Sequence, residues 1–179
     1  YNINNNYLNI ITIINIIMFF KLFSMLPLLR PIPVEQNITI PAYLGRWKQV
    51  ATSRSTALFG TGIDYQNVSA VYDIQFDKSL LQDVITVFNS GIDDKGNYTS
   101  ISGYSYITGK LATKRKLHFD GVPVDGNYWI VKLGPIENNE YQYAIISGPV
   151  SNWFGTRFSL YVLARNSQEY ESKYEFTVK

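Results

Sequence analysis

The 179-residue sequence contains no cysteine and only one histidine, His118. The absence of cysteine excludes disulfides, thiol catalysis, zinc sites with cysteine ligands and lipid attachment through cysteine. A single histidine disfavours both a Ser-His-Asp triad and a metal site built from several histidines. The sequence therefore predicts no catalytic residue, no metal site and no cofactor.

An excess of one charge is also missing. Lysine and arginine number 16 against 14 aspartate and glutamate residues, which gives a formal net charge of +2. Nucleic-acid-binding domains generally carry a strongly basic face or stripe. We therefore expect no nucleic-acid partner.

A long uninterrupted hydrophobic run is absent as well, although residues 1–40 differ in composition from the rest of the chain. The apolar stretch Leu8–Phe20 contains three polar residues and ends before Lys21, so it falls short of the roughly 20 residues of a bilayer span. Lys21 followed by the apolar segment 22–29 is typical of a secretory signal. We expect residues 1–40 to be a signal or anchor segment and the protein to be secreted or membrane-associated; a disordered leader is the alternative.

From Gly45 onward the sequence consists of short apolar runs separated by turn residues. Tyrosine (14) and phenylalanine (10) are abundant, and aromatic and β-branched side chains favour strands. The turns include Asp93–Asn97, Asp125–Asn127 and Glu137–Asn139, whose residue types tolerate positive φ. Eight such runs predict an all-β fold, an up-and-down antiparallel barrel. The runs are Arg46–Thr52, Val68–Phe76, Asp83–Asn89, Thr99–Thr108, Lys114–Phe119, Tyr128–Leu133, Tyr141–Ser147 and Phe158–Ala164.

Two segments depart from the strand pattern. The connector Ser53–Tyr65 is long and contains Gly60 and Gly62, which is typical of a mobile lid over a barrel mouth. At the other end Tyr170, Tyr174 and Val178 repeat every fourth residue, which predicts an amphipathic helix. Asn166 with Glu169 three residues later is a candidate capping box for its start.

Three segments together resemble the conserved motifs of the lipocalins. They are "YLGRWKQVA" (43–51), "YQYAIISGP" (141–149) and "LYVLAR" (160–165), in the family's order and approximate spacing. The segment "NYWIVKL" (127–133) is similar to the branch that contains apolipoprotein D and the bacterial lipocalins. The resemblance implies an eight-stranded calyx over residues 41–179, with a C-terminal helix packed outside it that this chain carries in truncated form.

The resemblance also implies roles for individual residues. Gly45 and Trp47 match the first motif, Tyr141 the second and Arg165 the third. In the family the arginine lies across the tryptophan at the closed end, an arrangement that a cation–π interaction would stabilise. We therefore expect these four residues to be structural. The family's usual disulfide is missing, because the chain has no cysteine.

A lipocalin calyx implies a small hydrophobic ligand, such as a fatty acid, lysophospholipid or sterol. Two alternatives stay open: a filled barrel that acts through its surface loops, and an isomerase or de-epoxidase on the same fold, which the lack of cysteine and of a second histidine disfavours. The expected ligand contacts are aromatic side chains of the strands, namely Tyr72, Phe88, Tyr104, Trp129, Tyr143 and Tyr161.

Two further features have an ordinary and a functional interpretation. His118 could bind haem, as in some lipocalins, but an ordinary strand histidine is the preferred interpretation. The basic segment Lys110–Lys116 could contact anionic lipid at a membrane surface. A solvated charged turn is the preferred interpretation of that segment.

Overall fold

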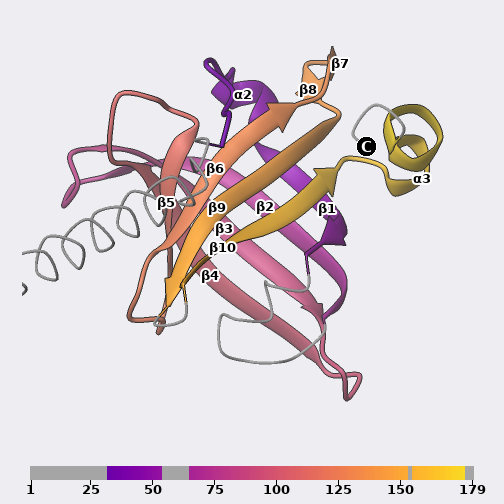
Figure 1. The fold of residues 1–179 in the computed structure, drawn as a ribbon, viewed down its shortest axis with the longest axis horizontal. Helices are drawn as coiled ribbons and strands as arrows, with labels where there is room; N and C mark the ends of the chain where they lie inside the picture. The colour runs from indigo at the N-terminus through magenta and orange to yellow at the C-terminus, as the bar shows by residue number, and fades with distance from the viewer. Residues whose placement is uncertain (1–31, 54–64, 153–154, 176–179) are drawn as a thin grey trace, which may run out of the picture. The chain divides into compact units, whose positions relative to one another are not determined.

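The structure, a computed structural model, describes residues 32–53, 65–152 and 155–175 (Figure 1). The chain divides into two units, Tyr1–Ile32 and Pro33–Lys179, and the features below belong to the second. The predicted signal or anchor segment up to residue 31, the glycines of the predicted lid and Val178 lie outside the described residues. Within the described part of the chain, no helix has the length and apolar character needed to cross a bilayer.

Eight antiparallel strands close into a barrel, which confirms the predicted fold. Each strand pairs with its neighbour along the chain, and β1 pairs with β10 to complete the circle. This closure leaves the barrel without a free sheet edge. The barrel strands are β1 (Gly45–Thr52), β2 (Gln66–Asp77), β3 (Gln82–Ile92), β4 (Tyr98–Ile107), β5 (Lys114–Phe119), β6 (Gly126–Leu133), β9 (Tyr143–Asn152) and β10 (Gly155–Ala164).

A small hairpin interrupts the run that was predicted as the seventh strand. Strands β7 (Ile136–Glu137) and β8 (Glu140–Tyr141) pair with each other and not with the barrel. Asn138 and Asn139 between them both have positive φ, 52° and 65°. Two consecutive positive φ values produce the tight turn that asparagine tolerates well. The predicted turn is therefore confirmed, but the barrel strand begins only at Tyr143.

The short helix α2 (Ile40–Tyr43) lies at one end of the barrel (Figure 1), and buried side chains close this end. Tyr43 and Trp47 are both fully buried there, and the indole Nε1 of Trp47 donates a hydrogen bond to the carbonyl oxygen of Tyr43 at 2.9 Å. Pro41 stands in the first turn of α2, where its missing N–H costs nothing. The short helix was not predicted from the sequence, because four residues carry no periodic signal.

Arg165 covers the tryptophan from the end of β10. Its guanidinium carbon lies 3.8 Å from the centroid of the Trp47 ring, so the predicted stacking is present. The same guanidinium donates hydrogen bonds to four carbonyl oxygens, those of Ala42, Leu44, Arg46 and Tyr141. One side chain therefore joins α2, β1 and the segment before β9.

Gly45 lies close to the Arg165 guanidinium and has a backbone conformation that favours glycine. Its φ is +91°, and a Cβ atom there would lie 3.3 Å from Nη1 of Arg165. Glycine alone adopts this φ without steric cost. The glycine of the first motif is thus favoured mainly by its positive φ, and the nearby arginine adds a tight contact for any larger residue.

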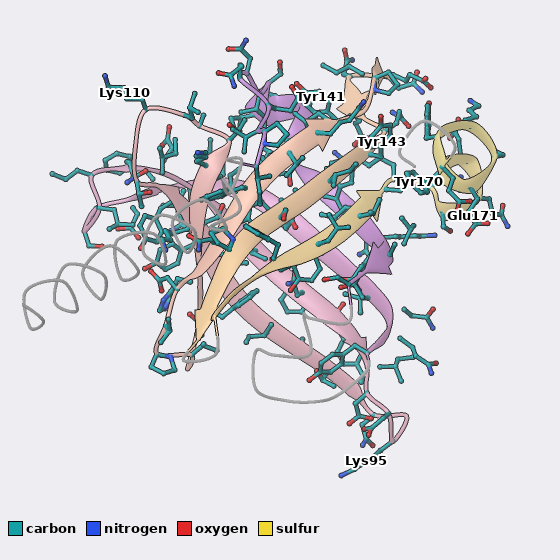
Figure 2. All side chains as sticks on the ribbon, viewed as in Figure 1. Lys95, Lys110, Tyr141, Tyr143, Tyr170 and Glu171 are labelled. Carbon is teal, nitrogen blue, oxygen red and sulfur yellow. The ribbon has the colours of Figure 1, made fainter. Side chains whose placement is uncertain are left out.

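The C-terminal segment packs outside the barrel as a short helix, α3 (Ser167–Glu169), followed by a π-helical turn, η2 (Tyr170–Tyr174). The side chain of Asn166 accepts hydrogen bonds from the backbone N–H groups of Gln168 and Glu169, as an N-cap does. Tyr170 lies against Tyr143 of β9, with ring centroids 5.8 Å apart (Figure 2). The outer wall beneath this segment is therefore apolar.

We predict that the Arg165→Met variant is destabilised by about 3 kcal/mol, because it loses charge-assisted hydrogen bonds and the cation–π contact. Urea unfolding followed by circular dichroism measures the change. The Arg46→Met variant is the matched control, since the Arg46 side chain is exposed. An equal effect in both variants would contradict the role assigned to Arg165.

Candidate functional site

The pairing register decides which side chains face the lumen of the barrel. Tyr72 of β2 and Tyr161 of β10 point inward and contact the main core cluster, which also contains Trp47. Phe88 pairs with Val71 and Tyr104 with Thr86, on the opposite face of β2–β4 from Tyr72. Since paired residues share a face of the sheet, Phe88 and Tyr104 lie on the outer wall.

Trp129 and Tyr143 also lie on the outer wall. Trp129 stands between the inward-facing Tyr128 and Ile130 of β6, and Nζ of Lys114 lies 4.5 Å from its ring centroid. Tyr143 belongs to the apolar cluster beneath the C-terminal helix. The expectation that Phe88, Tyr104, Trp129 and Tyr143 line the cavity is therefore corrected: the outer wall also carries large aromatic side chains, so an aromatic residue on a strand does not identify the inward face. Ligand contact by Tyr72 and Tyr161 stays a prediction.

Three buried tyrosine hydroxyls meet in the lumen near its closed end. The hydroxyl of Tyr128 lies 2.6 Å from that of Tyr43 and 3.0 Å from that of Tyr72. Burial raises the pKa of Tyr72 to about 12, and raises the pKa of Tyr43 and of Tyr128 well above the ordinary value. All three are therefore neutral hydrogen-bonding groups at physiological pH.

Arg115 of β5 is a buried cation beside this tyrosine cluster. It is 2% exposed, its Nε donates to Ser105 Oγ at 2.9 Å, and its Nη2 donates to the Ser105 carbonyl at 2.7 Å. Burial lowers the pKa of Arg115, and the neighbouring Tyr128 and Tyr43 partly oppose this. The preferred interpretation of the basic segment Lys110–Lys116 as a solvated charged turn is therefore wrong for Arg115. Arg115 shares a face of the strand with the apolar residues Leu117 and Phe119, since side chains alternate between the two faces. This pattern in the sequence was the signal that Arg115 points into the barrel.

Toward the other end, the lumen is lined by apolar side chains that are only half buried. Leu117, Phe119 and Tyr161 all pack against the core cluster, yet each keeps part of its surface accessible. Because these side chains point inward, their accessible surface faces the lumen. Burial also raises the pKa of Tyr161 to about 12.

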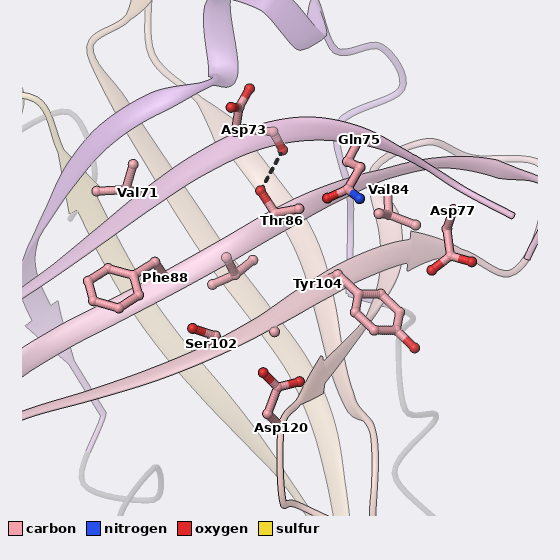
Figure 3. A pocket seen from close by; sticks show the side chains of 12 residues that line it. Val71, Asp73, Gln75, Asp77, Val84, Thr86, Phe88, Ser102, Tyr104 and Asp120 are labelled. Carbon is pink, nitrogen blue, oxygen red and sulfur yellow. Dashed lines mark hydrogen bonds between the residues drawn. The ribbon is translucent and has the colours of Figure 1, made fainter. Parts of the chain in front are cut away.

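A separate hollow of about 450 Å³ lies on the outer wall over β2–β4 (Figure 3). Phe88, which is 42% exposed, and Tyr104 form its aromatic part. Asp73, Asp77 and Asp120 give it a negative rim. The hollow is outside the barrel, so it is a different site from the lumen.

His118 also lies on the outer wall, opposite Tyr104 in the β4–β5 pairing. Its Nδ1 is 2.9 Å from Asp125 Oδ1, and Tyr106 donates to the other oxygen of the same carboxylate. These hydrogen bonds lower the pKa of Asp125. In the part of the chain that the structure describes, no three histidine, aspartate or glutamate side chains gather as a metal site. This placement agrees with an ordinary strand histidine.

A family profile described as lipocalin-like domain matches residues 38–179. The chain belongs to the lipocalin family. The match includes all the barrel strands and the C-terminal helix of this lipocalin. Its assignment to the branch of apolipoprotein D and the bacterial lipocalins stays a prediction.

Known relatives agree with this family. Temperature-induced lipocalin-1 of Arabidopsis thaliana is 26% identical over 154 residues, which cover 82% of this lipocalin and 73% of the plant protein. Lobster apocrustacyanin A1 superposes with a TM-score of 0.55 at 16% identity, covering 75% of this chain and 68% of its own. For H1 crustacyanin from the lobster Homarus americanus the TM-score is 0.56 at 18% identity, with coverages of 79% and 72%. These two structural likenesses concern the fold.

The raised pKa of Tyr72 predicts a loss of stability at alkaline pH. The unfolded chain releases this proton near pH 10 and the folded lipocalin near pH 12. The free energy of unfolding should therefore fall by about 2 kcal/mol as the pH rises from 10 to 12 through this group alone.

Urea unfolding between pH 8 and 11.5 measures this dependence in the wild type and in the Tyr72→Phe variant, whose stability should fall less steeply with pH. The Tyr98→Phe variant is the control, because that side chain is 69% exposed. An unchanged slope in the Tyr72→Phe variant would contradict the assignment.

Proposed function

We propose that this lipocalin binds a small hydrophobic ligand in the lumen of its barrel and carries or sequesters it, and that the ligand is a lipid such as a fatty acid, lysophospholipid or sterol. The lipocalin fold and the relatives support binding of small hydrophobic ligands in general. Lipocalins are typically binding proteins, so membership of the family favours a binding protein over an enzyme.

The observation that carries the proposal is the incomplete burial of inward-facing apolar groups. Leu117, Phe119 and Tyr161 contact the core but retain accessible surface. A ligand chain that covers such surface gains about 25 cal/mol for each Å² of apolar area removed from water. Below them, Tyr43 and Trp47 are fully buried, so the ligand would lie between these residues and the open end.

The outer hollow favours a second candidate function, an interaction through the barrel surface. Its Phe88 and Tyr104 are aromatic side chains on a sheet face, and exposed apolar groups in a concavity are typical of binding surfaces. Lumen and hollow lie on opposite faces of the same strands. A pair of variants therefore distinguishes them.

We predict that the Tyr161→Ala variant binds a neutral apolar fluorescent probe, N-phenyl-1-naphthylamine, about tenfold more weakly than the wild type, because it loses roughly 1.5 kcal/mol of apolar contact in the lumen. The Tyr104→Ala variant is the matched control from the outer wall and should bind as the wild type does. Probe fluorescence titration gives both affinities, and circular dichroism checks that each variant is folded.

Two results would contradict the proposal. If the wild type binds neither the probe nor any member of a panel of fatty acids, lysophospholipids and sterols, the barrel is not a carrier. If Tyr104→Ala weakens binding and Tyr161→Ala does not, the outer hollow is the binding site.

A further inference from the structure

We infer that the ligand of the lumen carries a carboxylate, which binds head-first to Arg115 and Tyr128 at the closed end. The inference rests on the proposed function and adds the chemical class of the ligand: long-chain carboxylic acids in preference to neutral lipids of the same length. Three observations support it, namely an unpaired buried charge, an excess of hydrogen-bond donors and the position of both groups below the apolar lining.

The positive charge of Arg115 has no carboxylate partner among the described residues. The ion pairs of those residues are His118–Asp125, Arg165–Glu140 and Lys173–Glu169. The groups that contact Arg115 are a serine hydroxyl and two backbone carbonyls, all neutral. A buried charge is costly unless it is paired. A ligand carboxylate would supply the missing negative charge.

The donors of Arg115 also exceed their acceptors. A guanidinium has five N–H groups, and Ser105 receives those of Nε and Nη2. Nη1 reaches its single acceptor, the carbonyl oxygen of Ala112, at 3.5 Å, which is a weak contact. A carboxylate oxygen could replace this contact, and carboxylates match the planar geometry of a guanidinium.

The tyrosine cluster shows the same excess of donors. Its three hydroxyls make two hydrogen bonds with each other. Each hydroxyl carries one hydrogen, so one O–H of the cluster has no acceptor among the described residues. Because Tyr128 is the Cα partner of Arg115 across β5 and β6, one acceptor group near Tyr128 could receive hydrogen bonds from both residues.

The position of the pair fits a ligand that enters with its head first. Arg115 precedes Leu117 and Phe119 on the inward face of β5, and both of these apolar residues keep accessible surface toward the lumen. Tyr128 retains 8% exposure and Arg115 2%. Fully buried Tyr43, Trp47 and Ile130 close the space beyond them. A small planar head group suits this floor, with the acyl chain against Leu117, Phe119 and Tyr161.

The test compares hexadecanoic acid with hexadecan-1-ol, which share a chain and differ in the head group. Displacement of N-phenyl-1-naphthylamine at pH 8 gives both affinities. The wild type should bind the acid at least tenfold more tightly than the alcohol. The Arg115→Met variant should bind both equally, and the Arg115→Lys variant should retain part of the preference. The matched control is Lys116→Met, which removes the adjacent charge on the outer face and should retain the full preference.

A second measurement needs no variant. The pKa of the carboxyl group is followed through the labelled carboxyl carbon of ¹³C-hexadecanoic acid. This pKa should be lower for the acid bound to the wild type than for the same acid in detergent micelles, because a neighbouring cation stabilises the carboxylate. A carboxyl pKa equal to or above that in micelles would overturn the inference even if the Arg115 variants do not fold.

The failure of this inference and the failure of the carrier function give different results. Equal affinity of the wild type for acid and alcohol leaves the carrier function intact and overturns the role of Arg115. A preference that survives Arg115→Met overturns it as well. Absence of binding for both compounds and for the probe contradicts the carrier function itself.

Discussion

The contact between Arg165 and Trp47 is the interaction on which the closed end of the barrel depends. The guanidinium stacks on the indole and also donates to four carbonyl oxygens from segments that lie up to 123 residues away in sequence. These charge-assisted hydrogen bonds are stronger than neutral ones. They hold α2 across the end of the barrel, and Gly45 beside them has a positive φ that favours glycine. Arg165 thus links more segments at the floor than any other side chain described above, and the hydrogen bonds of Tyr43 to Trp47 and Tyr128 add to it.

That floor is polar on its inner side, as the few polar groups that orient a ligand in a mainly apolar pocket are. Tyr43 and Trp47 close it, while Tyr72, Tyr128 and Arg115 present hydroxyl and guanidinium groups above them. The half-buried Leu117, Phe119 and Tyr161 form the apolar part nearer the mouth. Such a lumen has a region for a polar head group at its floor and a region for an apolar chain nearer its mouth. An amphiphile with an anionic end fits this order better than a uniformly apolar molecule.

The sequence predicted the barrel and its closure better than it predicted the lining. Turn residues between apolar runs located the strands, and the motifs around Trp47 and Arg165 located the closed end. The direction in which each strand residue points was harder to predict, because two large aromatic residues lie on the outer wall. Tyr143 packs against the C-terminal segment, and Lys114 covers Trp129. Arg115 shows the converse case, since a basic residue in a basic segment gives no sign of burial. Only the alternation with Leu117 and Phe119 carries that information.

A crystal structure of the protein with 12-bromododecanoic acid would locate the bound ligand, because the anomalous signal of bromine marks the end of the acyl chain unambiguously. We expect bromine inside the barrel on the mouth side of Leu117 and Tyr161, with the carboxylate at Arg115 and Tyr128. Bromine in the outer hollow beside Phe88 and Tyr104, or a barrel interior without bound acid at saturating concentration, would contradict it.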